Sequence, residues 1–94
     1  VYVGDVARAH VRAARHATIP AGKVDDRAFN LGTGRETSVV ELAQSLMRAA
    51  GRDVPLQHAP PRPGEQRRSV VSIAKAGAGL DWTPQVGLED GLAR

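Results

Sequence analysis

The fold is indicated most clearly by one stretch of the sequence, Ala28-Phe29-Asn30-Leu31-Gly32-Thr33-Gly34. It opens as a short apolar run of the kind that forms a buried β-strand, and two glycines close it. A helical pattern begins shortly afterwards, at Ser38. A strand, a glycine loop and a helix in this order indicate an α/β fold with parallel strand pairing. We expect Gly32 and Gly34 to be turn residues, because the third glycine of a dinucleotide-binding fingerprint is missing.

The helix after this stretch is the best-defined element in the sequence. Ser38 followed by Glu41 is a capping box, which predicts that the helix begins at residue 39. Gly51 is a typical C-terminal stop, so the predicted range is 39–50. Apolar residues recur at helical spacing and predict a buried face formed by Val39, Leu42, Ala43, Leu46, Met47 and Ala50.

The residues before this stretch predict a strand end and an alanine-rich helix. The apolar residues 1–3 are expected to end a buried strand. Asp5 is a good N-cap, which predicts a helix over residues 6–17. His10 falls on the predicted buried face of that helix, where we expect a hydrogen-bonded packing role rather than general-base catalysis. Residues 18–27 are expected to form a loop.

The second half of the chain predicts one further strand and two short helices. Residues 54–59 alternate as a strand does, and their proline lacks an amide donor, so this strand is expected at a sheet edge. Ser72 is expected to cap a helix over residues 73–80. Trp82 is expected to anchor the end of that helix by burial. Residues 87–90 begin a last helix, with two acidic residues in its positive first turn.

Composition limits the class of protein. The chain has 94 residues, 41% of them hydrophobic, a net charge of +3 and no cysteine. The lack of cysteine excludes disulfides, a thiolate nucleophile and a cysteine-ligated metal site, and it fits the cytoplasm, where we expect this protein. No apolar run approaches the ~20 residues that span a membrane. The 11 arginines and 2 lysines are interleaved with 10 acidic residues, which argues against a nucleic-acid-binding face.

The candidate binding residues lie in a loop rich in proline and glycine, at residues 59–69. Pro63 restrains the backbone beside Arg62, and Gly64 permits a sharp turn directly afterwards. A guanidinium can grip phosphate oxygens in a forked, bidentate way. A carboxylate can accept hydrogen bonds from the hydroxyls of a ribose. Arg62 and Glu65 could therefore hold the diphosphate and ribose of a nucleotide; the alternative is a solvated charged loop.

The order of the motifs carries more information than any one of them. They are Tyr2-Val3-Gly4-Asp5-Val6-Ala7-Arg8-Ala9-His10, Phe29-Asn30-Leu31-Gly32-Thr33-Gly34, Thr37-Ser38-Val39-Val40-Glu41-Leu42, Arg62-Pro63-Gly64-Glu65, Ala74-Lys75-Ala76, Leu80-Asp81-Trp82-Thr83-Pro84 and Leu88-Glu89-Asp90-Gly91-Leu92. Together they closely resemble the C-terminal part of the NAD-dependent epimerase/dehydratase family. These are extended short-chain dehydrogenases that act on nucleotide sugars, with UDP-glucose 4-epimerase as a familiar member. The resemblance covers essentially the whole chain.

This resemblance implies a Rossmann-type α/β fold with its last parallel strands. Residues 1–34 would be the tail of the NAD-binding Rossmann domain. Residues 35–94 would be a small α/β subdomain that binds the nucleotide sugar. In the family, the arginine of the Arg-x-Gly-Asp/Glu motif binds the nucleotide diphosphate and the acid holds ribose hydroxyls. The resemblance thus implies that Arg62 and Glu65 bind the substrate, which would be a UDP-sugar.

The resemblance also implies what this chain does not supply. The glycine-rich NAD loop and the catalytic Tyr-x-x-x-Lys pair of the family would lie upstream in a parent enzyme, expected to be a homodimer. Tyr2 cannot be that tyrosine, because Val6 stands where the lysine would be. No catalytic, NAD-binding or metal-binding residue is assigned here, and the chain, which looks cut at both ends, is expected to be inactive alone. Two alternatives stay open, a non-catalytic interaction or scaffold domain and a small basic nucleic-acid-binding module.

Overall fold

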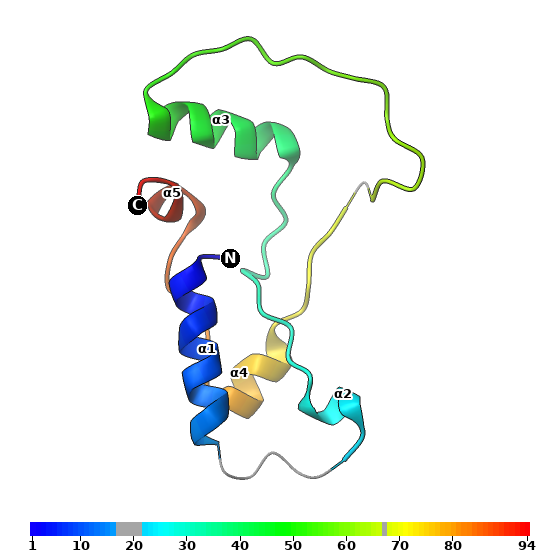
Figure 1. Ribbon diagram of the computed structural model, residues 1–94, viewed down its shortest axis with the longest axis vertical. Helices are drawn as coiled ribbons and strands as arrows, with labels where there is room; N and C mark the ends of the chain where they lie inside the picture. Colours follow the sequence, from blue (N-terminus) through cyan, green and yellow to red (C-terminus); the bar gives the residue numbers. More distant parts are fainter. Residues whose placement is uncertain (17–21, 67) are drawn as a thin grey trace.

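The computed structural model describes residues 1–16, 22–66 and 68–94 (Figure 1). The helices in these residues are α1 (Val3–Arg15), α2 (Val24–Arg27), α3 (Val39–Ala50), α4 (Ala74–Leu80) and α5 (Leu88–Leu92). The molecule is elongated and thin, with extents of 51 × 33 × 15 Å. Two pairs of helices are in contact, α1 with α4 and α3 with α5. Between α3 and α4 the chain makes one long arch, which is visible at the top and right of Figure 1.

The core lies where α1 meets α4. Its buried apolar members are Ala9, Ala76, Leu80 and Trp82. Because alanine has a small side chain, the two helices approach closely, and the indole of Trp82 closes the space between them. The prediction of a buried Trp82 is confirmed, since Trp82 is only 1% exposed. Four partly buried apolar residues surround this core, namely Ala13, Phe29, Leu31 and Ile73.

The N-terminal predictions need correction. No strand forms at residues 1–3, because α1 already begins at Val3 and Tyr2 is its N-cap. Asp5 is therefore not a cap but a buried member of the first turn. His10 is exposed rather than buried, because α1 contacts the core through Ala9 and His10 lies one position further round the helix. Its Nδ1 lies 2.8 Å from the Val6 carbonyl oxygen of the same helix.

No β-strand is formed in any part of the chain that the structure describes, so the predicted α/β class is not seen here. Residues 28–31 instead follow α2 as irregular chain, and Phe29 and Leu31 pack on the core. The expected edge strand at residues 54–59 is an exposed part of the arch. The physical reason is that a strand is stable only when a neighbour completes its backbone hydrogen bonds. Propensity alone does not supply that neighbour.

The bounds predicted for α3 are confirmed. Ser38 Oγ accepts a hydrogen bond from the Glu41 amide at 3.1 Å, and Gly51 adopts a left-handed φ of 61°. The predicted buried face is wrong, however. Val39 is 80% exposed and Leu46 48% exposed, Leu42 and Ala50 are exposed too, and Ala43 and Met47 are only half-buried. The helix instead turns towards α5 the side that carries Ser45, a residue that is only 4% exposed.

The remaining short helices follow the predictions in part. Helix α4 covers most of the expected range, but Ile73 rather than Ser72 is its N-cap. It ends at Asp81, whose left-handed φ of 49° lets the Trp82 amide bond back to the Ala76 carbonyl at 3.2 Å. Helix α5 follows Gly87 with Glu89 and Asp90 in its first turn, as predicted.

The predicted loop over residues 18–27 contains a short helix, because α2 occupies its second half. The Lys23 amide donates to the Asp26 carboxylate at 2.8 Å, which closes the first turn of α2. Residues 17–21, where the first predicted helix was expected to end and this loop to begin, lie outside the described residues.

Candidate functional site

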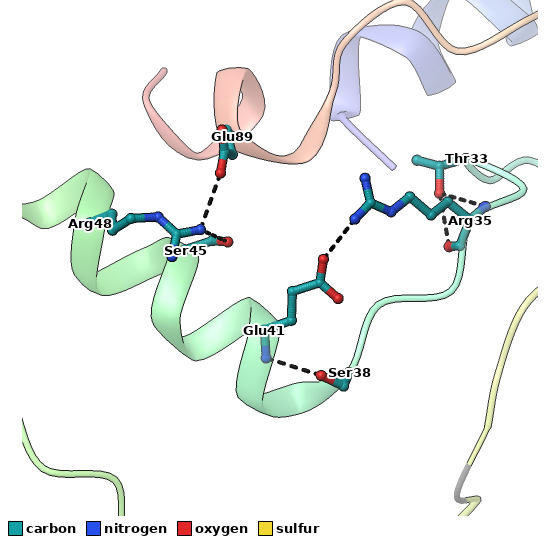
Figure 2. A network of polar contacts seen from close by, with 7 residues as sticks. All are labelled: Thr33, Arg35, Ser38, Glu41, Ser45, Arg48 and Glu89. Carbon is teal, nitrogen blue, oxygen red and sulfur yellow. Dashed lines mark hydrogen bonds and ion pairs between the residues drawn. The ribbon is translucent and has the colours of Figure 1, made fainter.

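A broad cleft of about 1070 Å³ lies between α3, α5 and the start of α1. Its lining combines the apolar residues 1–3, the polar side of α3, and residues 84–92, which lead into and form α5. Figure 2 shows the polar wall of this cleft from close by. The cleft is large enough for a nucleotide-sized ligand, since small-molecule sites usually measure about 300–1,000 Å³.

The Arg35 side chain forms one end of the polar wall. Its Nη2 donates to Glu41 Oε1 at 2.8 Å, so Glu41 reaches Arg35 instead of completing the expected capping box (Figure 2). Thr33 Oγ1 accepts from the Arg35 amide at 3.3 Å and donates to the Arg35 carbonyl at 3.2 Å. These bonds fix the loop between the glycine turn and α3, and the Arg35 side chain lines the cleft while 76% of it stays exposed to solvent.

The other end of the wall connects α3 with α5. Arg48 Nη2 donates to the buried Ser45 Oγ at 2.9 Å and to Glu89 Oε1 at 3.1 Å (Figure 2). Glu89 thus pairs with a cation on α3 while it also lies in the first turn of α5. The wall carries both signs of charge, which suits a polar ligand with hydroxyl groups better than a simple anion.

The sequence carried a signal for this wall that the prediction did not use. Glu41, Ser45 and Arg48 stand at positions i, i+4 and i+7 of α3, which places them on one face of a helix. The apolar residues of the same helix were given the inward face because burial of apolar side chains is the usual outcome. Arg35 and Glu89 gave no comparable local signal, because their partners lie on other elements.

The predicted binding residues Arg62 and Glu65 lie at the two ends of a tight turn. The Glu65 amide donates to the Arg62 carbonyl at 3.2 Å, and Gly64 has a φ of 79°, the pattern of a type II turn with Pro63 in its second position. Glu65 Oε2 also accepts from the Arg62 amide at 3.3 Å. The structure therefore brings the two residues together on one exposed turn, and neither of them lines the cleft.

One ion pair joins the end of the arch to the loop before α3. Arg68 Nε and Nη2 donate to the two carboxylate oxygens of Glu36, both at 2.7 Å. The hydrogen bond from Arg68 lowers the pKa of Glu36 below its ordinary value, and the same bond raises the pKa of Arg68, although desolvation opposes both shifts. This forked geometry fixes direction as well as distance, in contrast to a pair held by a single bond.

The carboxylate of Asp5 is the central buried polar group of the molecule. It is fully buried and accepts three hydrogen bonds, from the amides of Gln85 and Val86 at 3.0 Å each and from Arg8 Nη1 at 2.7 Å. Burial by itself raises the pKa of Asp5, but the bonds from Val86, Gln85 and Arg8 together outweigh it, so the pKa lies below its ordinary value. The Asp5 backbone carbonyl accepts from Trp82 Nε1 at 2.8 Å. Asp5 thus ties α1 to the chain before α5.

The glycine turn is packed against a neighbouring segment at Gly32. A Cβ placed on Gly32 would lie 2.7 Å from Val71 Cγ2, so the space beside this glycine is filled by a neighbouring segment of the chain. This supports the interpretation of Gly32 as a residue of close backbone approach. Within the described ranges, no three His, Asp or Glu side chains are grouped so as to hold a metal ion. None of the described helices is long and apolar enough to cross a membrane.

Comparison with known proteins identifies relatives along the whole chain. The chain is 42% identical over 94 residues to a UDP-glucose 4-epimerase of Mycolicibacterium smegmatis, and this alignment covers 100% of the chain and 28% of the relative. It is 34% identical over 90 residues to a UDP-glucose 4-epimerase of Cyamopsis tetragonoloba and to a bifunctional UDP-glucose and UDP-xylose 4-epimerase of Pisum sativum, covering 96% of this chain and 25% of each relative. The chain thus spans about a quarter of the length of these relatives. No protein-family model matches it.

Proposed function

We propose, from the homology of the chain to UDP-glucose 4-epimerases, that it is the C-terminal substrate-binding portion of an NAD-dependent nucleotide-sugar epimerase or dehydratase. In this proposal residues 1–34 belong to the NAD-binding domain and residues 35–94 to the subdomain that binds a UDP-sugar. The complete enzyme is a cytoplasmic homodimer. It carries its NAD loop and its catalytic tyrosine and lysine outside these 94 residues.

The observation that carries the substrate-binding role is the turn at Arg62 and Glu65. The turn is closed by the bond from the Glu65 amide to the Arg62 carbonyl at 3.2 Å. This bond fixes the distance between the two backbone positions that carry the side chains. Both residues are exposed, which leaves the guanidinium accessible to a diphosphate. One oxygen of Glu65 accepts from the Arg62 amide, and the other oxygen can accept from a ribose hydroxyl.

The described residues contribute binding and orientation to the reaction. Arg62 would hold the diphosphate through two parallel hydrogen bonds, which restricts rotation of the whole nucleotide sugar. Pro63 limits the freedom of the turn before the ligand arrives, so less conformational entropy is lost on binding. Bound NAD supplies the transient oxidation of the sugar. The proposal assigns cofactor binding to the rest of the enzyme, because the third glycine of a dinucleotide-binding fingerprint is missing after Gly32 and Gly34.

The proposal is tested by Arg62→Ala in the complete enzyme. Loss of a charged bidentate contact costs about 1.5–3 kcal/mol, so we expect the KM for the UDP-sugar to rise about 10- to 100-fold. The Kd for NAD should change less than twofold, because Arg62 is assigned to the substrate alone. Arg52→Ala is the matched control, since Arg52 is an exposed arginine of the same arch outside the turn. Equal effects on substrate and NAD, or no effect on either, would contradict the proposal.

A further inference from the structure

The arch that carries the Arg62–Glu65 turn has little to hold it in place. All residues from 51 to 66 are exposed. At its start the arch is tied to α3 by the Arg52 amide, which donates to the Met47 carbonyl at 3.0 Å. The next described hydrogen bond to another element is made by the Arg68 side chain at the far end, which reaches Glu36. The position of the turn therefore depends on these two ends.

The far end of the arch runs antiparallel to the loop before α3. Gly32 lies against Val71, and Glu36 lies against Arg68, so the two segments run in opposite chain directions. The two segments are the cyan-to-green and yellow traces between α2, α3 and α4 in Figure 1. The close contact at Gly32 sets their spacing near the core, whereas the ion pair sets it next to the arch.

Apolar packing cannot replace the ion pair at that place. Val70 is 54% exposed and Val71 is 40% exposed, so the segment beyond Arg68 buries little surface. The Glu36 side chain is 35% exposed and the Arg68 side chain 81% exposed. An exposed pair adds little to overall stability, but the fork joins both carboxylate oxygens to a planar group and so specifies orientation.

We propose that Glu36 and Arg68 are positioning residues that set where the Arg62–Glu65 turn stands relative to α3 and the loop before it. The inference rests on the proposed function, because it concerns the residues that bind the nucleotide diphosphate and ribose. Neither Glu36 nor Arg68 needs to touch the substrate. Arg68 follows Glu65 by three residues, and its bond to Glu36 is the nearest described hydrogen bond that joins this side of the turn to another segment.

The test uses the complete enzyme with three variants. Glu36→Gln removes the charge of the acceptor, Arg68→Lys keeps the positive charge but cannot form the fork, and Glu36→Arg/Arg68→Glu exchanges the partners. We expect the first two to raise the KM for the UDP-sugar about two- to fivefold with kcat unchanged. The exchanged pair should restore the KM. Asp81→Asn is the matched control, because it breaks an exposed ion pair with Arg12 that is remote in sequence from the arch.

A second measurement separates this inference from the proposed function. Spin labels at Ala59→Cys and Gln44→Cys report the distance between the arch and α3; these 94 residues have no cysteine to compete for the label, and any cysteine elsewhere in the complete enzyme is first replaced by serine. We expect one narrow distance distribution in the wild-type background and a broad one with Glu36→Gln. If Arg62→Ala raises the KM but Glu36→Gln changes neither the KM nor the distribution, the inference is overturned. If Arg62→Ala has no effect, the proposed function fails, and the distance distribution alone decides whether the pair positions the turn.

Discussion

Replacing Asp5 by alanine should remove the connection between α1 and the chain that leads into α5. The change leaves the part-buried amides of Gln85 and Val86 without their acceptor and takes away the carboxylate that Arg8 contacts at 2.7 Å. Breaking a buried ion pair by removing one partner costs about 3–5 kcal/mol. The Arg8 side chain is 34% exposed and can recover water, so we expect a value near the lower limit, about 3 kcal/mol.

Trp82 provides the readout for this experiment. It is the single tryptophan of the chain, it is 1% exposed, and its indole donates to the Asp5 carbonyl at 2.8 Å. Unfolding by urea should therefore shift its fluorescence to longer wavelength, and Asp5→Ala should lower the free energy of unfolding by about 3 kcal/mol. If the wild-type chain is less stable than this, the variant should show unfolded fluorescence without urea.

Asp53→Ala is the control for the loss of an acidic side chain, because Asp53 is exposed on the arch. Its free energy of unfolding should stay within about 0.5 kcal/mol of the wild-type value. An Asp5→Ala variant whose free energy of unfolding lies within 1 kcal/mol of that of this control would refute the reasoning, because the loss of three hydrogen bonds to a buried carboxylate should cost more than that.

Three further outcomes follow from the same contacts. Because the native pKa of Asp5 is lowered, its contribution to stability should be complete above the ordinary aspartate pKa and should disappear as the pH falls through the lower native pKa. In urea titrations at acidic pH, Asp5→Asn should therefore make the free energy of unfolding less dependent on pH. An unchanged pH dependence of that free energy below pH 4 would contradict this prediction. Gly77→Ala should raise the free energy of unfolding by about 0.5–1 kcal/mol, because the nearest atom to its new Cβ, at 3.8 Å, leaves room for the better helix former. Gly79→Ala should lower the free energy of unfolding by about 1 kcal/mol when both variants are unfolded in urea, because its Cβ would lie 2.9 Å from Phe29 Cε1; equal effects at the two positions would show that helix propensity outweighs packing.

Whether a feature was predicted correctly depends on how far apart in the sequence its interacting residues lie. Helix α3 was predicted with correct bounds because Ser38 and Gly51 act within one turn of the helix they delimit. The orientation of α3 was predicted wrongly because the choice between its apolar side and its Ser45 side depends on α5, which lies about 40 residues further along the chain. The resemblance to epimerases was predicted from ordered motifs and is confirmed by relatives that align over the whole chain.

By itself, the sequence determined the features that neighbouring residues enforce. These are the cap and stop of α3 and the turn at Arg62 and Glu65. Only the tertiary structure decided that residues 28–31 are not a strand, that Asp5 is a buried acceptor and that Glu36 meets Arg68. A cap or a turn closes its hydrogen bonds within a few residues, whereas a strand, a buried carboxylate and an ion pair each need a partner that the fold must bring from elsewhere in the chain.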